Sequence, residues 1–126
     1  MKLSLPSITG WTCAILVSAL NLFAGIMKFV PVETGSPQDL MMQQMGMTGG
    51  LIHVLGVIEI ASVILFLIPR TSTVGFVLMV GYMGGVLATL LTHAQDATMI
   101  YVALALLTVS AYFRNPELLG RLRAQA

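Results

Sequence analysis

Charged side chains are scarce in this sequence, and their scarcity limits the surroundings that suit the protein. Only 9% of the 126 residues are Asp, Glu, Lys or Arg, and 57% are hydrophobic. A soluble domain usually has about a quarter charged and less than half apolar residues. The net charge of +1 argues against a nucleic-acid partner, because phosphate binding needs clustered basic side chains. We therefore expect a single domain, residues 1–126, with the lipid bilayer as its main surroundings.

Cysteine and cofactor motifs are also nearly absent. Cys13 is the only cysteine, which excludes an internal disulfide and a cysteine metal cluster. The two histidines, His53 and His93, lack the ligand spacing of a zinc or haem site. The sequence therefore predicts no metal site. Without a haem, flavin or iron–sulfur motif, electrons for any redox reaction would have to come from a partner or a reducing substrate.

What the sequence has instead is four apolar runs. Each is close to the length that an α-helix needs to cross the hydrocarbon core, and none alternates as a membrane strand would. Backbone polar groups must be satisfied internally in lipid, so we expect helices. The predicted fold is an all-α membrane four-helix bundle with antiparallel up-down topology. Its helices are expected at residues 8–28, 51–68, 74–92 and 97–113. The first is too long for a signal-peptide core, and we expect it to be retained.

Basic residues are distributed unequally over the two predicted sides. One side carries the long loop of residues 29–48 and only one cation, Lys28. The other side carries Lys2, Arg70, Arg114, Arg121 and Arg123. Under the positive-inside rule this distribution places both termini, with the tail of residues 114–126, in the cytoplasm. We therefore expect a multi-pass protein of the inner (cytoplasmic) membrane.

The outer loop is rich in methionine. Four methionines fall within seven residues: Met41, Met42, Met45 and Met47. Thioether sulfur selects Cu(I), whereas methionine more commonly fills irregular gaps in apolar packing. Without a cysteine or a histidine pair nearby, we prefer a short amphipathic segment that packs on the outer mouth of the bundle.

A few polar residues lie within the apolar runs. At 1.5 Å per residue, Asn21 lies ~10 Å below Lys28, and Glu59 lies ~14 Å below the outer end of its helix. A carboxylate at this depth is unfavourable by roughly 2.5–3.5 kcal/mol, so it should face the interior and have a partner. The predicted ligand pocket consists of Asn21, Lys28, His53, Glu59, Tyr82 and His93. The alternative is that Glu59 only fixes the helix register. No catalytic residue is predicted.

Three short motifs occur together in the chain. Phe23-Ala-Gly-Ile-Met-Lys28 closes the first apolar run, and Gly56-Val-Ile-Glu59 lies inside the second. Leu67-Ile-Pro-Arg70 ends the second run, and a run rich in glycine and alanine then leads to Thr92-His93. With these motifs the chain resembles the DoxX-like family of small four-helix membrane proteins over residues 8–113. The resemblance implies that Lys28 and Glu59 are the polar signature, and it supplies no catalytic mechanism for either residue.

The resemblance leaves two functions open. The family takes its name from a subunit of a thiosulfate:quinone oxidoreductase, which implies a redox-associated subunit that binds a quinone or similar lipid-soluble ligand and works with a membrane redox partner. Other relatives are not enzymes, and one is an animal chaperone that helps to assemble nicotinic receptors. This implies an assembly factor or scaffold for partner membrane proteins. The Gly81-x-x-x-Gly85 pattern favours close helix contact, and homo-oligomers are compatible with it. Whether the protein is an enzyme is left open.

Overall fold

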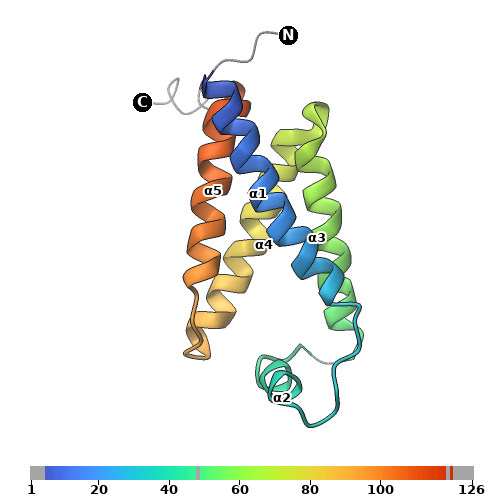
Figure 1. Ribbon diagram of the computed structural model, residues 1–126. Coiled ribbons are helices and arrows are strands. Elements are labelled where there is room, and N and C mark those ends of the chain that lie inside the picture. Colours follow the sequence, from blue (N-terminus) through green and yellow to red (C-terminus); the bar gives the residue numbers. More distant parts are fainter. Residues whose placement is uncertain (1–4, 48, 119, 121–126) are drawn as a thin grey trace.

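The protein is described here by a computed structural model, which describes residues 5–47, 49–118 and 120. Over these residues the chain is helical and has no strand (Figure 1). The all-α class predicted from the sequence is therefore confirmed. The elements are α1 (Leu5–Met27), α2 (Pro37–Gln44), α3 (Leu51–Leu67), the short 3₁₀ turn η1 (Pro69–Thr71), α4 (Ser72–Thr92) and α5 (Thr98–Arg114).

The four long helices pack unequally. In Figure 1, α3 and α5 stand at the two sides, and α1 and α4 slope between them in opposite directions. The most extensive contact is between α1 and α5, followed by α3 with α4 and α1 with α3. Helices α4 and α5 follow each other directly in the chain but contact each other much less. The slope of α4 explains this, because α4 starts beside the end of α3 and approaches α5 only towards its own end (Figure 1).

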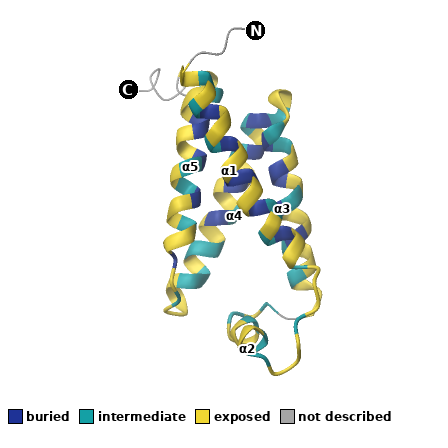
Figure 2. Cartoon of the chain, in the orientation of Figure 1, coloured by how far each residue is buried: buried dark blue, intermediate teal, exposed yellow. Residues whose placement is uncertain are grey.

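The core is small and lies where the long helices meet. Buried residues lie on the helix sides that face the interior, and exposed residues cover the outer sides (Figure 2). Each long helix contributes two residues to the core: Ala14, Val17, Val63, Phe66, Met79, Met83, Ala103 and Leu107. Large apolar side chains also cover the outer surface, where Leu5 is 76% and Phe23 is 69% exposed. Such a surface is unfavourable in water and suits a hydrocarbon solvent.

Two helices meet the length and hydropathy expected of a membrane span. These are Leu5–Met27 with 23 residues and the continuous segment Pro69–Thr92 with 24 residues. Leu51–Leu67 and Thr98–Arg114 are apolar too, at 17 residues each. A 17-residue helix is about 25 Å long at 1.5 Å per residue, which lies at the short end of the usual range for a span.

Gly75 allows α3 and α4 to approach each other closely. A Cβ atom placed on Gly75 of α4 would lie 2.1 Å from the backbone nitrogen of Phe66 in α3. Backbone atoms cannot rotate out of the way as a side chain does, so only a residue without a Cβ fits here. This contact sets the approach of α3 and α4, and it agrees with the small-residue packing typical of membrane helices.

The segments that connect the long helices have local structure of their own. The outer loop of residues 29–48 contains a helix, α2, which lies apart from the long helices (Figure 1). In the turn before α5, the Asp96 carboxylate accepts hydrogen bonds from the backbone N–H and the hydroxyl of Thr98. These bonds lower the pKa of Asp96 below its ordinary value. Of the basic residues used for the orientation, Lys2, Arg121 and Arg123 lie outside the described residues.

Candidate functional site

The candidate site is built where α1 and α3 cross. The crossing is close because both helices present a glycine: a Cβ on Gly56 would lie 3.1 Å from the carbonyl oxygen of Gly25 and 2.8 Å from the Phe29 ring. Lys28 and Glu59 each follow one of these glycines by three residues, and residues three apart share a helix face. The two glycines therefore place the ammonium and the carboxylate on facing sides of the crossing.

Lys28 reaches inward along its own helix to meet Glu59. Its Nζ lies 3.3 Å from the carbonyl oxygen of Ala24, one turn back along α1. A helical side chain naturally points towards the N-terminus of its helix, which for α1 is the direction away from the outer loop. From this position Nζ lies 2.5 Å from Oε2 of Glu59.

A third helix completes the cluster. The hydroxyl of Tyr82, on α4, donates to the same Oε2 atom of Glu59 at 3.1 Å. The Lys28 Nζ atom also lies 5.8 Å from the centre of the Tyr82 ring. We call these three residues the Lys28–Glu59–Tyr82 cluster. It links α1, α3 and α4 through polar side chains.

Burial makes this cluster energetically important. The Glu59 side chain is 5% exposed and that of Lys28 is 17% exposed. A buried carboxylate without a partner is strongly unfavourable, and both the ammonium and the hydroxyl offset its lost hydration. Glu59 therefore has the interior location that a membrane-embedded carboxylate requires, and its position depends on two neighbouring helices.

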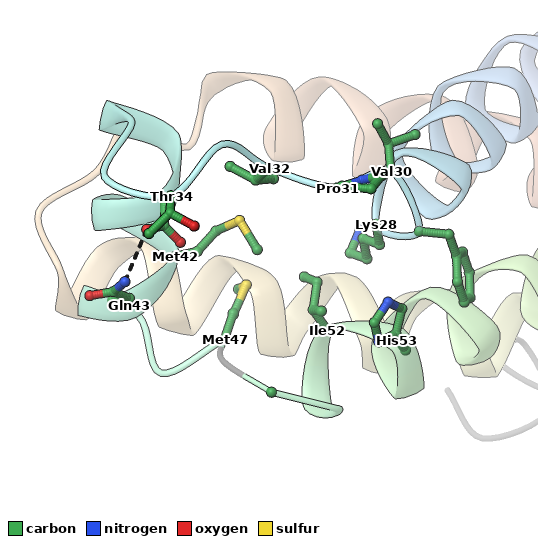
Figure 3. A pocket seen from close by; sticks show the side chains of 13 residues that line it. Lys28, Val30, Pro31, Val32, Thr34, Met42, Gln43, Met47, Ile52 and His53 are labelled. Carbon is green, nitrogen blue, oxygen red and sulfur yellow. Dashed lines mark hydrogen bonds between the residues drawn. The ribbon is translucent and has the colours of Figure 1, made fainter.

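Lys28 also borders a cavity on the α2 side of the crossing. The cavity has a volume of about 530 Å³ and lies between the α2 segment and the adjoining ends of α1 and α3. Figure 3 shows Lys28 and His53 at one end, and Met42 and Met47 at the other. An ammonium has three N–H donors. Within the described part of the chain Lys28 uses two, on Glu59 and Ala24, which leaves one for a group in the cavity.

A second hollow adjoins the cluster on the α4 side. This groove has a volume of about 340 Å³, and Tyr82 forms part of its wall. Apolar groups dominate the rest, including Leu51, Leu55 and Val86. Met47 lines both this groove and the cavity that Lys28 borders. Met47 therefore borders both hollows, and each hollow is also lined by one member of the Lys28–Glu59–Tyr82 cluster.

The structure separates the six residues of the predicted pocket. It brings Lys28, Glu59 and Tyr82 into contact. His53 shares the cavity lining with Lys28 and packs on the Phe29 ring, with ring centres 5.4 Å apart.

The remaining two residues, Asn21 and His93, form hydrogen bonds with the backbone of their own segments. Asn21 is buried and donates to the carbonyl oxygen of Val17 on its own helix, at 2.8 Å. His93 is exposed beyond the end of α4, and its Nδ1 lies 2.8 Å from the carbonyl oxygen of Thr89.

Sequence reasoning missed the apolar walls of the cavity. Phe29, Met42, Met47 and Ile52 line it beside Lys28. Helix periodicity does not predict this grouping, because α2 and the loop residues fold back over the crossing only in three dimensions. The methionine-rich loop was the available signal. It indicated that this loop packs on the end of the bundle, but it did not indicate which residues it contacts.

The fold and the site define a small helical membrane protein with an interior ion pair. The family model described as the DoxX-like family matches residues 12–113, so the chain belongs to the DoxX-like family. The resemblance stated from the sequence is thereby confirmed. No curated protein and no solved structure matches the chain.

Proposed function

We propose that this protein spans the inner membrane four times, has both termini in the cytoplasm, and binds a quinone or a similar lipid-soluble carbonyl compound as part of a membrane redox assembly. Two helices of span length and two of 17 residues support the membrane arrangement. The preponderance of Lys and Arg on one side supports the orientation. Membership of the DoxX-like family agrees with a redox association.

One observation carries the ligand proposal. The Lys28 ammonium is fixed by Glu59 and, among the described residues, keeps one N–H donor without a partner at the wall of a cavity of about 530 Å³. A quinone carbonyl oxygen is an acceptor that matches this donor. Ligand pockets of this size are typically apolar with a few well-placed polar groups, and Phe29, Met42 and Ile52 supply apolar walls here.

The neighbouring groove suits the rest of such a ligand. A lipid-soluble quinone has a polar ring and an apolar tail. With its ring beside Lys28, the tail extends past Met47 into the groove formed by Leu51, Leu55 and Val86. No electron-carrying group is needed in this chain for that role, because the redox partner supplies the electrons.

Ligand titration tests the proposal. The purified protein in lipid nanodiscs is titrated with a short-chain benzoquinone, and bound ligand is measured by equilibrium dialysis. A hydrogen bond from a charged donor contributes about 1.5–3 kcal/mol, so Lys28→Met should weaken binding roughly 10–100-fold. Arg70→Met is the matched control, because it removes an exposed cation remote from the cavity. Equal binding by the Lys28→Met variant and wild type, with helicity unchanged, contradicts the proposal.

The orientation is tested separately by labelling. In a Cys13→Ser background, which has no cysteine, single cysteines are introduced at Gln95 and at Arg70. A membrane-impermeant maleimide added to intact cells should label position 95 and spare position 70. The opposite pattern, or labelling of both positions, would show that the proposed topology is wrong.

A second function, an assembly factor or scaffold for membrane proteins, is favoured by a different observation. Gly81, Gly84 and Gly85 lie on α4, and a Cβ on any of them would meet no described atom within 4 Å. Gly-x-x-x-Gly surfaces are typical of helix–helix contacts in membranes, yet the described chain leaves this one open. Gly81→Ile with Gly85→Ile should therefore preserve the fold and abolish partner recovery in mild detergent. If the double variant recovers the same partners as wild type, this surface is not the docking site.

A further inference from the structure

Five methionines surround one small cavity beside α2. The cavity has a volume of about 230 Å³ and is lined by Met27 from the end of α1 and by Met41, Met42, Met45 and Met47. The described residues contain no group of three or more His, Cys, Asp or Glu suited to a metal ion. Thioether sulfur is therefore the ligand type concentrated at this end of the molecule.

The backbone holds two of these methionines together. Helix α2 ends in a Schellman motif: the N–H of Met47 bonds to the carbonyl of Met42 at 2.9 Å, and the N–H of Gly46 bonds to the carbonyl of Gln43 at 3.1 Å. Gly46 has the positive φ of 74° that this motif requires. The motif brings the side chains of its first and last residues into proximity, and Figure 3 shows the sulfur atoms of Met42 and Met47 lining the same cavity.

The start of α2 is fixed as firmly as its end. The Ser36 side chain accepts a hydrogen bond from the N–H of Asp39 at 3.2 Å, and Pro37 occupies the first helical turn. Both are strong helix-start signals. The eight-residue helix is therefore defined at both ends, and its methionines are displayed from a constrained backbone.

Packing alone does not account for this cluster. Methionine in a core fills irregular gaps, but no residue of α2 is buried, and Met41 is 38% exposed. The nearest cation, Lys28, has its charge balanced by Glu59 at 2.5 Å, which reduces its repulsion of a bound metal ion. Thioethers select Cu(I) over harder divalent ions.

We propose that Met42, Met45 and Met47 form a thioether site for Cu(I) at the outer end of the protein. Met42 and Met47 are the principal ligands, because each lines both the 230 Å³ and the 530 Å³ cavities. Met45 lies between them in the chain and lines the smaller cavity. Cu(I) binding at this site requires neither the ion pair nor a quinone, although Met42 and Met47 also line the cavity proposed for the quinone.

A competition titration tests the site. The purified full-length protein in detergent is titrated with Cu(I) against bicinchoninate in the presence of a reductant. A parallel titration uses Ag(I), which has similar ligand preferences and needs no reductant. The test variant is Met42→Leu with Met47→Leu, since leucine preserves the apolar contact of the Schellman motif and removes only the sulfur. Met99→Leu is the control, because Met99 is an exposed methionine on α5.

Wild type and the Met99→Leu variant should bind one Cu(I), with sulfur neighbours in X-ray absorption. Loss of a residue that only hydrogen-bonds to a metal ligand typically lowers metal affinity roughly 10–100-fold. Loss of two ligands should therefore lower the Cu(I) affinity by at least the same factor. Three results would each overturn the proposal: wild type that holds no Cu(I) against the chelator, a double leucine variant with unchanged affinity, or a His53→Gln variant that alone abolishes binding. Circular dichroism confirms that each variant is folded.

Discussion

Lys28 and Glu59 form a pair whose coupling can be measured by a double-mutant cycle. Removing one partner of a buried ion pair typically destabilises a protein by about 3–5 kcal/mol, because the other charge is left unpaired. The Lys28 side chain is 17% exposed and that of Glu59 is 5% exposed, so the lower end of this range applies. We expect Lys28→Met to lower the free energy of unfolding by about 3 kcal/mol.

The second single variant should be milder. Glu59→Gln keeps a carbonyl oxygen that accepts the hydrogen bond of Tyr82, and the ammonium of Lys28 adjoins an open cavity. We expect a loss of about 1–3 kcal/mol. The double variant carries no charge at the crossing, so its loss should be smaller than the sum of the two single losses by about 1–3 kcal/mol, the coupling typical of residues in contact.

The assay is the free energy of unfolding in mixed micelles, measured by SDS titration with circular dichroism. Lys28→Arg serves as a control that keeps the charge. Single losses that simply add in the double variant would show that the two side chains do not interact in the folded protein. The Lys28–Glu59 ion pair would then not hold α1 and α3 together at the site, which would refute its proposed structural role.

Three further predictions concern the helix contacts. Gly75→Ala places a methyl group 2.1 Å from a backbone nitrogen and should lower the free energy of unfolding by about 1–3 kcal/mol or more in the same SDS titration. Gly81→Ala is the control, because its methyl group meets open space and should leave stability unchanged. Equal effects of the two variants would contradict the close contact of α3 and α4 at Gly75. The hydroxyl of Thr73 donates to Glu117 and holds the pKa of that carboxyl below its ordinary value of 4.5. The contact therefore adds stability above pH 4.5 that is lost as pH falls through the folded-state pKa; Thr73→Val should remove this part of the acid-side loss in pH-dependent thermal unfolding, and an unchanged profile would exclude the contact. Arg114 lies 4.1 Å from the ring centre of the chain's only tryptophan, so Arg114→Met should lower stability by roughly 0.5–2 kcal/mol and alter the tryptophan emission; unchanged emission would exclude the stacking.

Much of the architecture was predictable from hydropathy. Four apolar runs indicated the long helices. A chain with only 9% charged residues suits lipid, where a helix satisfies its own backbone hydrogen bonds. The packing between the helices was harder to predict from the sequence. The up-down topology implies that α4 and α5 pack along their length, but α4 starts beside α3 and approaches α5 only towards its own end, so its contact with α5 is smaller than its contact with α3. Neither this path nor the close approach of α3 and α4 at Gly75 is revealed by a one-dimensional pattern.

The candidate site was predictable in part. Depth arguments indicated that Glu59 needs an interior partner and identified both Lys28 and Tyr82 as options. They also included Asn21 and His93, because depth and helix face do not show whether a side chain bonds to its own backbone. Asn21 does so with Val17, and His93 lies near the carbonyl of Thr89. Such local hydrogen bonds compete with contacts between helices and appear only in coordinates.

The extensive contact between α1 and α5 has a consequence for synthesis. These are the first and last long helices of the described chain, and a ribosome makes them in that order. All the residues up to α5 must therefore emerge before α1 can make its most extensive contact. Until then the side of α1 that packs on α5 stays open to other helices, so a nascent chain is at risk of mispairing. Loss of α5 should therefore be more damaging than its short length suggests.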